Sequence, residues 1–258
     1  MLGGEGLSGA RAFFDDRAYR YLGESAWITD IELVDDLVEP LQGMKKVLDV
    51  CSGPSVLADA ARHRDARTVA LDLSLRMLMQ GPADIARVCG DAQSLPFQEK
   101  CFDTALCRQG LHYAQNPRGV VEEMIRVTKG EVRFSNVVML QAEDLPFWES
   151  YAYLVTPARR QYFLQGDLAR LATHLGCDVV RHRIFEYSTS VAPSVQHLDP
   201  DAQQAVRDLF LKQPDHITSS YQIRPFATDV SYVVRWESVH ARVPDWPRAL
   251  DSRDWERR

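Results

Sequence analysis

The sequence contains none of the patterns that mark a membrane span, a metal site or a disulfide framework. No apolar run approaches the ~20 residues that a transmembrane helix needs, and the first residues lack the basic and apolar regions of a signal peptide. The five cysteines form no CxxC pair, and the seven histidines form no HxxxH or HExxH pair. We therefore expect reduced thiols, no metal and a cytoplasmic protein.

Positive charge is also in short supply. Lys and Arg number 30 against 36 Asp and Glu, so the formal net charge is −6. Such a chain lacks the basic face that broad contact with nucleic acid requires. Its 258 residues, 45% of them apolar, suffice for one large α/β domain with a buried core. We expect a small-molecule substrate, no nucleic-acid or membrane partner, and a monomer or homodimer.

Patterns typical of strands and of helices alternate along the chain. β-branched and apolar runs predict strands at 46–50, 67–72, 85–89, 102–107, 131–140, 178–187 and 230–236. Helical periodicity predicts helices within 10–40 and at 54–63, 74–80, 117–128, 145–156, 166–175 and 200–212. This order is typical of a parallel sheet with right-handed crossovers and helices on both faces.

Three aspartates stand at the ends of successive predicted strands. Asp49 and Asp72 close the first and second strands, and Asp91 follows the third. Because ligands in open parallel sheets bind beyond the carboxyl ends of the strands, we expect the three acids to line one crevice. Asp72 suits a grip on two ribose hydroxyls. Asp91 can accept from an exocyclic amine while the Ala92 N–H donates to a ring nitrogen, so the pattern predicts a nucleoside-like ligand.

The first predicted strand runs into the short turn Cys51-Ser52-Gly53-Pro54-Ser55, and a helical pattern follows. Strand, tight turn and helix N-terminus are together typical of nucleotide-like sites in doubly wound sheets. The turn is not the GxGxxG of dinucleotide-binding dehydrogenases, which argues against that class.

These segments are similar to the class I S-adenosylmethionine-dependent methyltransferases, especially the small-molecule branch with the ubiquinone/menaquinone-type C-methyltransferases. The resemblance covers 44–140 well and 165–187 loosely. It is carried by Val47–Ser55, Val69–Leu78, Gly90–Phe97, Phe102–Tyr113 and the Val120–Thr128 helix with the strand that follows it. It implies a Rossmann-like seven-stranded sheet of order 3-2-1-4-5-7-6, with an antiparallel last strand and flanking helices.

The resemblance implies S-adenosyl-L-methionine as cofactor. Asp72 would hold its ribose and Asp91 its adenine amine, while Asp49, Cys51 and Gly53 would border the methionine part. Further predicted cofactor contacts are Leu73, Met77, Ala92, Arg108 and Tyr21. The family commonly carries glycine at positions 51, 53 and 55, and this chain keeps only Gly53. Loss of glycine matters where φ is positive or where a Cβ would strike the ligand.

His112 is the predicted catalytic residue, because it follows the fourth strand on the cofactor side and its ordinary pKa suits a base. The alternative is a histidine that only packs. Arg108 is expected to pair with the cofactor carboxylate, a substrate acid or Asp49. Tyr19, Tyr21 and Trp27 are expected either to cap the site or to pack the N-terminal helices together.

The expected organisation is one methyltransferase-like domain over 1–243 and a flexible tail over 244–258. Within the domain, 10–40 form an N-terminal helical lid, 44–140 the cofactor-binding core, and 141–243 the substrate region with the last strands. Residues 188–228 form an insertion before the last strand. The predicted function is methylation of O, N or C of a small-molecule metabolite. The alternatives are a non-methylating reaction on the same fold, such as decarboxylation or cyclisation, and a non-catalytic binding protein.

Overall fold

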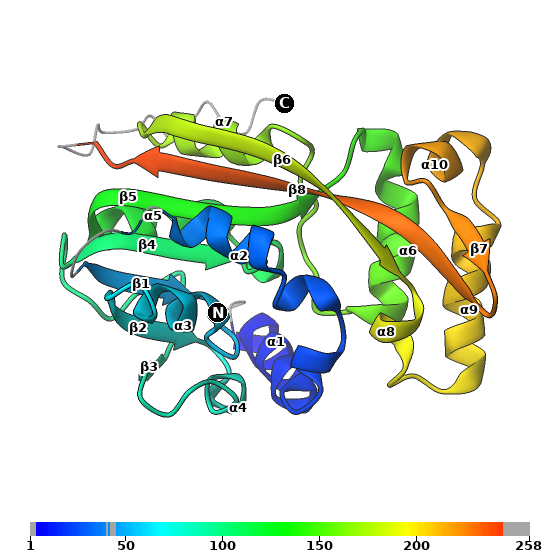
Figure 1. Cartoon of the computed structure of the whole chain (residues 1–258), viewed down its shortest axis with the longest axis horizontal. Helices are drawn as coiled ribbons and strands as arrows, with labels where there is room; N and C mark the ends of the chain where they lie inside the picture. Colours follow the sequence, from blue (N-terminus) through cyan, green and yellow to red (C-terminus); the bar gives the residue numbers. More distant parts are fainter. Residues whose placement is uncertain (1–3, 40, 42–44, 245–258) are drawn as a thin grey trace.

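A single mixed sheet forms the centre of the protein in the computed structural model, which describes residues 4–39, 41 and 45–244 (Figure 1). The strand order is β3-β2-β1-β4-β5-β8-β6, and short β7 pairs with β8. The strands are β1 Lys46–Val50, β2 Arg67–Asp72, β3 Ala86–Cys89, β4 Phe102–Arg108, β5 Thr128–Val138, β6 Asp178–Ser190, β7 Arg224–Phe226 and β8 Asp229–Arg242.

The predicted sheet is confirmed. Strands β1 to β5 pair in parallel, and β8 runs antiparallel to both β5 and β6. Strand β8 is thus the seventh long strand of the expected order. The sequence did not predict β7, which is only three residues long and folds back on the start of β8 as a hairpin.

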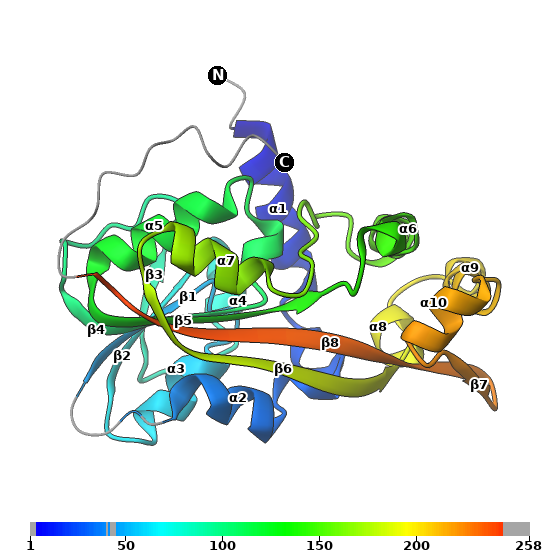
Figure 2. The ribbon, with the colours of Figure 1, turned by 90° about the horizontal axis from the view of Figure 1, so that it is seen from above.

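Helices cover both faces of the sheet (Figure 2). Helices α5 (Pro117–Val127) and α7 (Asp167–His174) lie on one face, and α2 (Ile31–Val38) and α3 (Val56–Arg62) on the other. The first face holds the largest apolar core, in which Val121 and Met124 of α5 pack with Leu168 of α7. The second core joins Leu37 of α2 to Leu57 of α3 across β1. This two-sided burial explains the apolar centres of β1 and β4, the two strands in the middle of the parallel part of the sheet.

The N-terminal segment and the connections carry the remaining helices. The described ones are α1 Gly4–Arg17, η1 Tyr21–Gly23, η2 Ala26–Ile28, α4 Leu75–Leu78, η3 Leu111–Tyr113, η4 Ala142–Asp144, α6 Leu145–Val155, α8 Ala192–Val195, α9 Pro200–Leu211 and α10 Asp215–Ser220. None of the described helices has the length and apolar character needed to cross a bilayer.

Strands β6 and β8 continue past the end of β5 and carry the insertion with them (Figure 1). Strand β8 pairs with β5 only from Arg235 onward, whereas its pairing with β6 begins at Ser231. We call residues 187–234 the arm. Its helices α8, α9 and α10 pack with α6 in a separate core that includes Trp148, Phe210 and Tyr232. The arm therefore has a hydrophobic core of its own beside the sheet.

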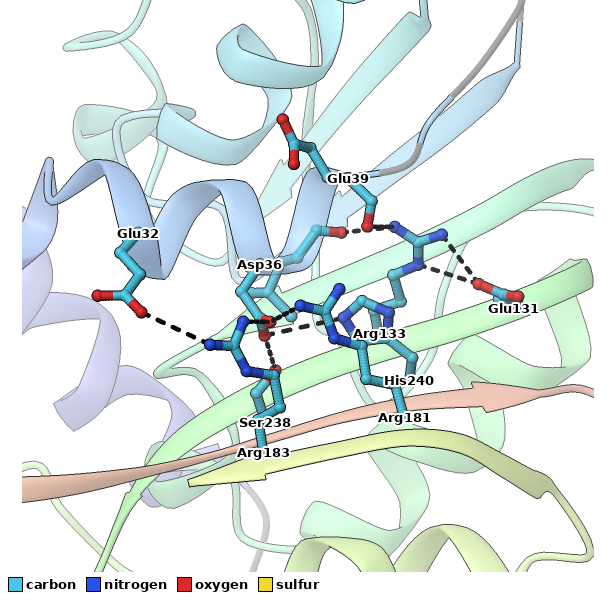
Figure 3. A network of polar contacts seen from close by, with 10 residues as sticks. Glu32, Asp36, Glu39, Glu131, Arg133, Arg181, Arg183, Ser238 and His240 are labelled. Atoms are coloured by element: carbon cyan, nitrogen blue, oxygen red, sulfur yellow. Dashed lines mark hydrogen bonds and ion pairs between the residues drawn. The ribbon is translucent and has the colours of Figure 1, made fainter. Parts of the chain in front are cut away.

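A polar network fastens α2 to the sheet (Figure 3). The buried carboxylate of Asp36 accepts from Arg183 Nη1 at 2.9 Å and from the Ser238 hydroxyl, and it pairs with Arg181 Nη2 at 2.9 Å. Burial lowers the pKa of the adjacent His240 to about 4, so its ring is neutral at pH 7 and adds no ion pair. At the end of α2, Arg133 Nη1 donates to the Leu37 carbonyl at 3.0 Å. These contacts fix α2, the helix between the N-terminal segment and β1.

The helix bounds differ from prediction where the backbone is unusual. The helix predicted at 54–63 begins only at Val56, because Ser55 is left-handed with φ 63°. Helical spacing over 145–156 predicts core positions for Trp148, Tyr151 and Tyr153, but Tyr153 is 81% exposed. The predicted tail over 244–258 lies outside the described residues, apart from Pro244. The expected division into lid, cofactor core and substrate region stays a prediction.

Candidate active site

A cavity of about 810 Å³, counted with its opening to solvent, lies beyond the carboxyl ends of the parallel strands. We call it the strand-end cavity. It is bordered by most of the side chains that the sequence singled out: Tyr21, Cys51, Gly53, Asp72, Leu73, Met77, Asp91, Ala92 and Arg108. A side pocket of about 320 Å³ shares Tyr21, Cys51, Gly53 and Arg108 with it and reaches Asp49. The predicted crevice thus exists, while the role of each residue in it stays a prediction.

The turn after β1 uses left-handed backbone at all three positions where the family commonly has glycine. Cys51 has φ 54°, Gly53 φ 54° and Ser55 φ 63°. A non-glycine residue in this conformation costs on the order of 1 kcal/mol, so Cys51 and Ser55 store strain in the turn. Backbone bonds hold the turn in place, with Ser52 N donating to Leu71 O and Ser55 N to Ser52 O, each at 3.0 Å.

Asp72 is held in place by the backbone on two sides. Its Oδ2 accepts from Gly53 N at 2.8 Å, and its Oδ1 accepts from Ser74 N at 2.9 Å. Burial raises the pKa of this carboxyl, and the backbone donors oppose the rise. Each carboxylate oxygen has a second lone pair, so the side chain can still accept from two hydroxyls in the cavity.

Asp91 has one occupied and one open oxygen. Its Oδ1 accepts from Gln93 N at 2.9 Å, whereas Oδ2 has no hydrogen-bond donor among the described residues. The neighbouring Ala92 N–H also finds no acceptor in the part of the chain that the structure describes. An open acceptor beside an open donor matches the edge of an adenine ring, which offers an amine and a ring nitrogen.

The side pocket joins an acid and a cation. Asp49 Oδ2 accepts from Ala58 N at 3.0 Å. Burial raises the pKa of Asp49 to about 7, opposed by that bond and by the nearby charge of Arg108. Arg108 Nη2 donates to the Ile28 carbonyl at 2.6 Å, and its guanidinium lies 5.7 Å from the Trp27 ring centre. No carboxylate pairs with Arg108 among the described residues, so it remains available to an incoming acid.

The N-terminal segment covers the strand-end cavity. Ala10 and Phe14 of α1 line it together with Tyr21 of η1. The Phe14 ring packs edge-on against the Tyr113 ring, with the ring centres 4.7 Å apart. The hydroxyl of Ser74, at the start of α4, donates to the carboxylate of Asp15 in α1. Burial raises the pKa of Tyr21 to about 12, so its hydroxyl stays protonated at pH 7.

A second cavity, of about 730 Å³, meets the first at Gln109 and Tyr113, which line both. We call it the aromatic cavity, because six rings border it: Trp27, Tyr113, Trp148, Tyr151, Tyr232 and Trp236. Its walls come from the N-terminal segment, from η3 and α6, and from the arm, which contributes Thr189, Ser194 and Tyr232. Trp27 therefore lies in a cavity wall and also stacks on Trp236 at 5.0 Å.

His112 lies in the wall of the aromatic cavity and is not part of the strand-end cavity. Asn136 Nδ2 donates to Val137 O, which leaves the amide Oδ1 facing His112 Nδ1 at 2.8 Å. An amide oxygen only accepts, so Nδ1 carries the proton and Nε2 presents its lone pair. Burial, together with the charge of Arg159, lowers the pKa of His112 well below its ordinary value. The ring is therefore neutral at pH 7.

Sequence reasoning missed Arg159, Gln109 and Phe14, although all three line one of the two cavities. Phe14 belongs to the predicted lid, and its aromatic neighbours were a usable signal. Arg159 follows α6 in a loop without periodicity. It reaches the cavity because Arg160 N and Gln161 N donate to the His112 carbonyl at 2.9 and 3.0 Å, a contact that no local pattern encodes.

Residues 48–136 match the family described as a methyltransferase domain. Over 157 residues the chain is 39% identical to the demethylmenaquinone methyltransferase of Paenarthrobacter aurescens, covering 60% of this chain and 58% of that protein. The enzyme of the same name from Renibacterium salmoninarum is 35% identical over 130 residues, covering 46% of this chain and 53% of that protein. The chain thus spans little more than half the length of these relatives.

Solved structures share the fold over a larger part of the chain. The crystal structure of a methyltransferase candidate from Bacillus halodurans covers 83% of this chain and 99% of its own, with a TM-score of 0.74. Its sequence identity is 20%, so this likeness concerns the fold alone.

The strand-end cavity fits the cofactor of this family. It offers an acid for ribose hydroxyls at Asp72, an open acceptor and donor for adenine at Asp91 and Ala92, and an unpaired cation for a carboxylate at Arg108. The glycine positions of the turn keep their left-handed backbone although two side chains differ. The sheet order and the match of residues 48–136 thus agree in making this segment a class I S-adenosylmethionine-dependent methyltransferase domain.

Proposed function

We propose that this protein transfers a methyl group from S-adenosyl-L-methionine to an O, N or C atom of a small-molecule metabolite. The contact between the two cavities at Gln109 and Tyr113 is the observation that carries the proposal. A donor in one cavity and an acceptor in the other would meet at this boundary. Holding two reactants in line accounts for much of the rate of such a displacement.

The residues proposed to hold the cofactor are those that line the strand-end cavity and the side pocket. Asp72 would accept from the ribose hydroxyls and Asp91 from the adenine amine, with Ala92 N–H donating to the ring. Arg108 would pair with the carboxylate, and Asp49 lies within the same pocket. Cys51, Gly53, Leu73, Met77 and Tyr21 would shape the cavity walls. When bound, S-adenosylmethionine supplies a methyl group already activated for transfer.

His112 is the proposed base. Its Nε2 lone pair borders the aromatic cavity, and its Nδ1 proton is held by Asn136. If the acceptor is a hydroxyl, His112 Nε2 would take its proton while the oxygen bonds to the methyl carbon, whose bond to the donor's sulfonium sulfur breaks and leaves neutral S-adenosylhomocysteine. The six rings around the acceptor exclude water, which would otherwise compete for the base.

A small-molecule acceptor is supported by two observations. The aromatic cavity is enclosed by side chains from four parts of the chain, which suits a compact molecule rather than a polymer. The curated relatives named above carry the name of demethylmenaquinone, which is a small molecule. We propose no identity for the acceptor of this chain on that ground.

Calorimetry tests the first half of the proposal and mass spectrometry the second. We expect S-adenosylmethionine and S-adenosylhomocysteine to bind the purified protein, and an added acceptor to gain 14 mass units, the mass of one methylene. No heat at millimolar cofactor would contradict the proposal. Cofactor that binds but never becomes S-adenosylhomocysteine with any acceptor would favour a non-methylating reaction or a binding protein.

A further inference from the structure

The aromatic cavity holds one half-buried cation that no acid among the described residues neutralises. Arg159 lines the cavity, and its Nε donates to the Gln161 carbonyl at 3.2 Å. Its two terminal nitrogens donate to no residue in the part of the chain that the structure describes, and no carboxylate pairs with it there. The guanidinium lies 4.8 Å from the centre of the Tyr162 ring, so one carbonyl and one aromatic ring support its charge.

The other charges around the cavity are already paired. Arg17 and Glu24 both line it, and they form an ion pair with each other. Glu24 also accepts from Arg20 Nε at 3.0 Å, so its charge is shared between two arginines. His112 is neutral. The charge that remains in the cavity is therefore positive and sits on Arg159.

The position of Arg159 relative to His112 is fixed by the backbone. The two residues after Arg159 donate their N–H groups to the His112 carbonyl at 2.9 and 3.0 Å. Arg159 and His112 both line the aromatic cavity, and the guanidinium is near enough for its charge to lower the pKa of the His112 ring. A ligand with an acid and a hydroxyl on one ring can meet both groups at once.

We propose that the aromatic cavity binds an aromatic acid, with its ring among the six aromatic side chains, its carboxylate on Arg159 and its hydroxyl on His112 Nε2. A half-buried guanidinium without an acid loses hydration that nothing of opposite charge replaces, and a carboxylate that enters beside it forms a charge-assisted, bidentate pair. The rings supply stacking surfaces at low cost in side-chain entropy. This inference rests on the proposed function where it assigns the cavity to the methyl acceptor.

Two matched pairs of probes test the proposal: 4-hydroxybenzoate against 4-hydroxybenzamide, and 4-hydroxycinnamate against its amide. Each acid and its amide share the ring and the hydroxyl and differ in charge. Binding is followed by quenching of the fluorescence of the cavity tryptophans and by calorimetry, with and without S-adenosylhomocysteine. We expect the acids to bind the wild-type protein at least about tenfold more tightly than the amides, as a charged hydrogen-bonded pair warrants.

Variants assign the preference to one residue. Arg159→Gln should bring acid and amide to equal affinity, and Arg159→Lys should keep part of the preference because it keeps the charge. Arg170→Gln is the matched control, since it removes the same charge from a residue on the surface of α7. It should leave the preference unchanged. Thermal melting of each variant checks that it is folded.

Four results would overturn the proposal: equal binding of acid and amide by the wild type, failure of all four probes to bind at millimolar concentration, a preference that survives Arg159→Gln, or its loss in Arg170→Gln. Because the probes are also titrated without cofactor, failure of S-adenosylhomocysteine to bind would contradict the proposed function and leave the acid preference measurable.

Discussion

The side chain of Cys51 occupies space that exists only because residue 110 is glycine. A Cβ placed on Gly110 would lie 2.4 Å from Cys51 Cβ and 2.7 Å from its Sγ. Gly110 itself has φ −96°, which any residue adopts, so it is required for room and not for backbone freedom. The turn after β1 has Cys51 where the family commonly has glycine, and this side chain in return requires glycine at position 110 in the turn after β4.

The effects of substituting Cys51 and Gly110 on the free energy of unfolding should be strongly coupled. Gly110→Ala in the wild type should lower the free energy of unfolding by about 1–3 kcal/mol, because the new methyl group collides with Cys51. In a Cys51→Gly background the same change should cost at least about 1 kcal/mol less. Urea denaturation of the four proteins measures the difference. The control Gly9→Ala has open space around it and should not destabilise. Equal costs in both backgrounds would contradict the contact.

Asp72 has two tasks that one experiment can separate. Asp72→Asn should weaken S-adenosylhomocysteine binding by about 1–3 kcal/mol, because an amide nitrogen cannot accept from a ribose hydroxyl. The wild type should prefer adenosine to 2′,3′-dideoxyadenosine, and the variant should lose that preference in calorimetry. If the substitution weakens the binding of both nucleosides equally, Asp72 acts only by accepting from the N–H groups of Gly53 and Ser74. The exposed Asp208→Asn is the control.

The raised pKa of Asp49 predicts how stability changes with pH. In the unfolded chain the pKa is about 3.9, and in the folded protein burial raises it to about 7. The folded state therefore keeps a proton that the unfolded state has released. The stabilising contribution of this carboxyl is complete below pH ~4 and is lost as pH rises through about 7, by at most ~1.4 kcal/mol per pH unit.

Asp49→Asn removes this dependence, so the stability of the wild type minus that of the variant should fall from pH 5 to pH 7.5 in urea titrations. A positively charged cofactor favours the ionised carboxylate, so its binding near pH 6 should release a proton, detected as buffer-dependent heat. A difference between the two proteins that does not change with pH would show that Asp49 is ionised throughout.

Asp36 is predicted to anchor the lid as well as α2. Asp36→Asn removes the charge that Arg181, Arg183 and Ser238 converge on, and should cost about 2 kcal/mol in urea denaturation. This expected loss of stability is smaller than for a fully buried ion pair, since Arg181 and Arg183 are partly exposed. Glu32→Gln is the matched control, because Glu32 is exposed and contacts Arg183 at 3.5 Å. An equal loss of stability in Glu32→Gln and in Asp36→Asn would show that α2 does not depend on Asp36.

The sequence predicts best where local pattern and final contacts agree. Strands 46–50 and 67–72 are predicted to the residue, because apolar runs end at turn residues and both faces are buried. Asp72 and Asp91 lie at the same cavity because the parallel topology brings the strand ends together. This follows from the alternation of strands and helices alone.

Prediction fails where distant segments decide the outcome. Arg159 belongs to the aromatic cavity through hydrogen bonds to a carbonyl 47 residues earlier in the chain, at His112. Helical spacing gave Trp148 and Tyr153 the same environment, yet Trp148 is 5% exposed and Tyr153 is 81% exposed. The arm packs on one side of α6 only, and no local signal in 145–155 says which side.

The separate core of the arm has a consequence for how this protein can diversify. The residues that line the strand-end cavity end at Arg160, whereas Thr189, Ser194 and Tyr232 of the arm complete the wall of the aromatic cavity. Changes within 187–234 can therefore reshape the aromatic cavity and leave the lining of the strand-end cavity unchanged. The long β6–β8 ladder joins the arm to the sheet, so the same sheet can carry an arm of another shape.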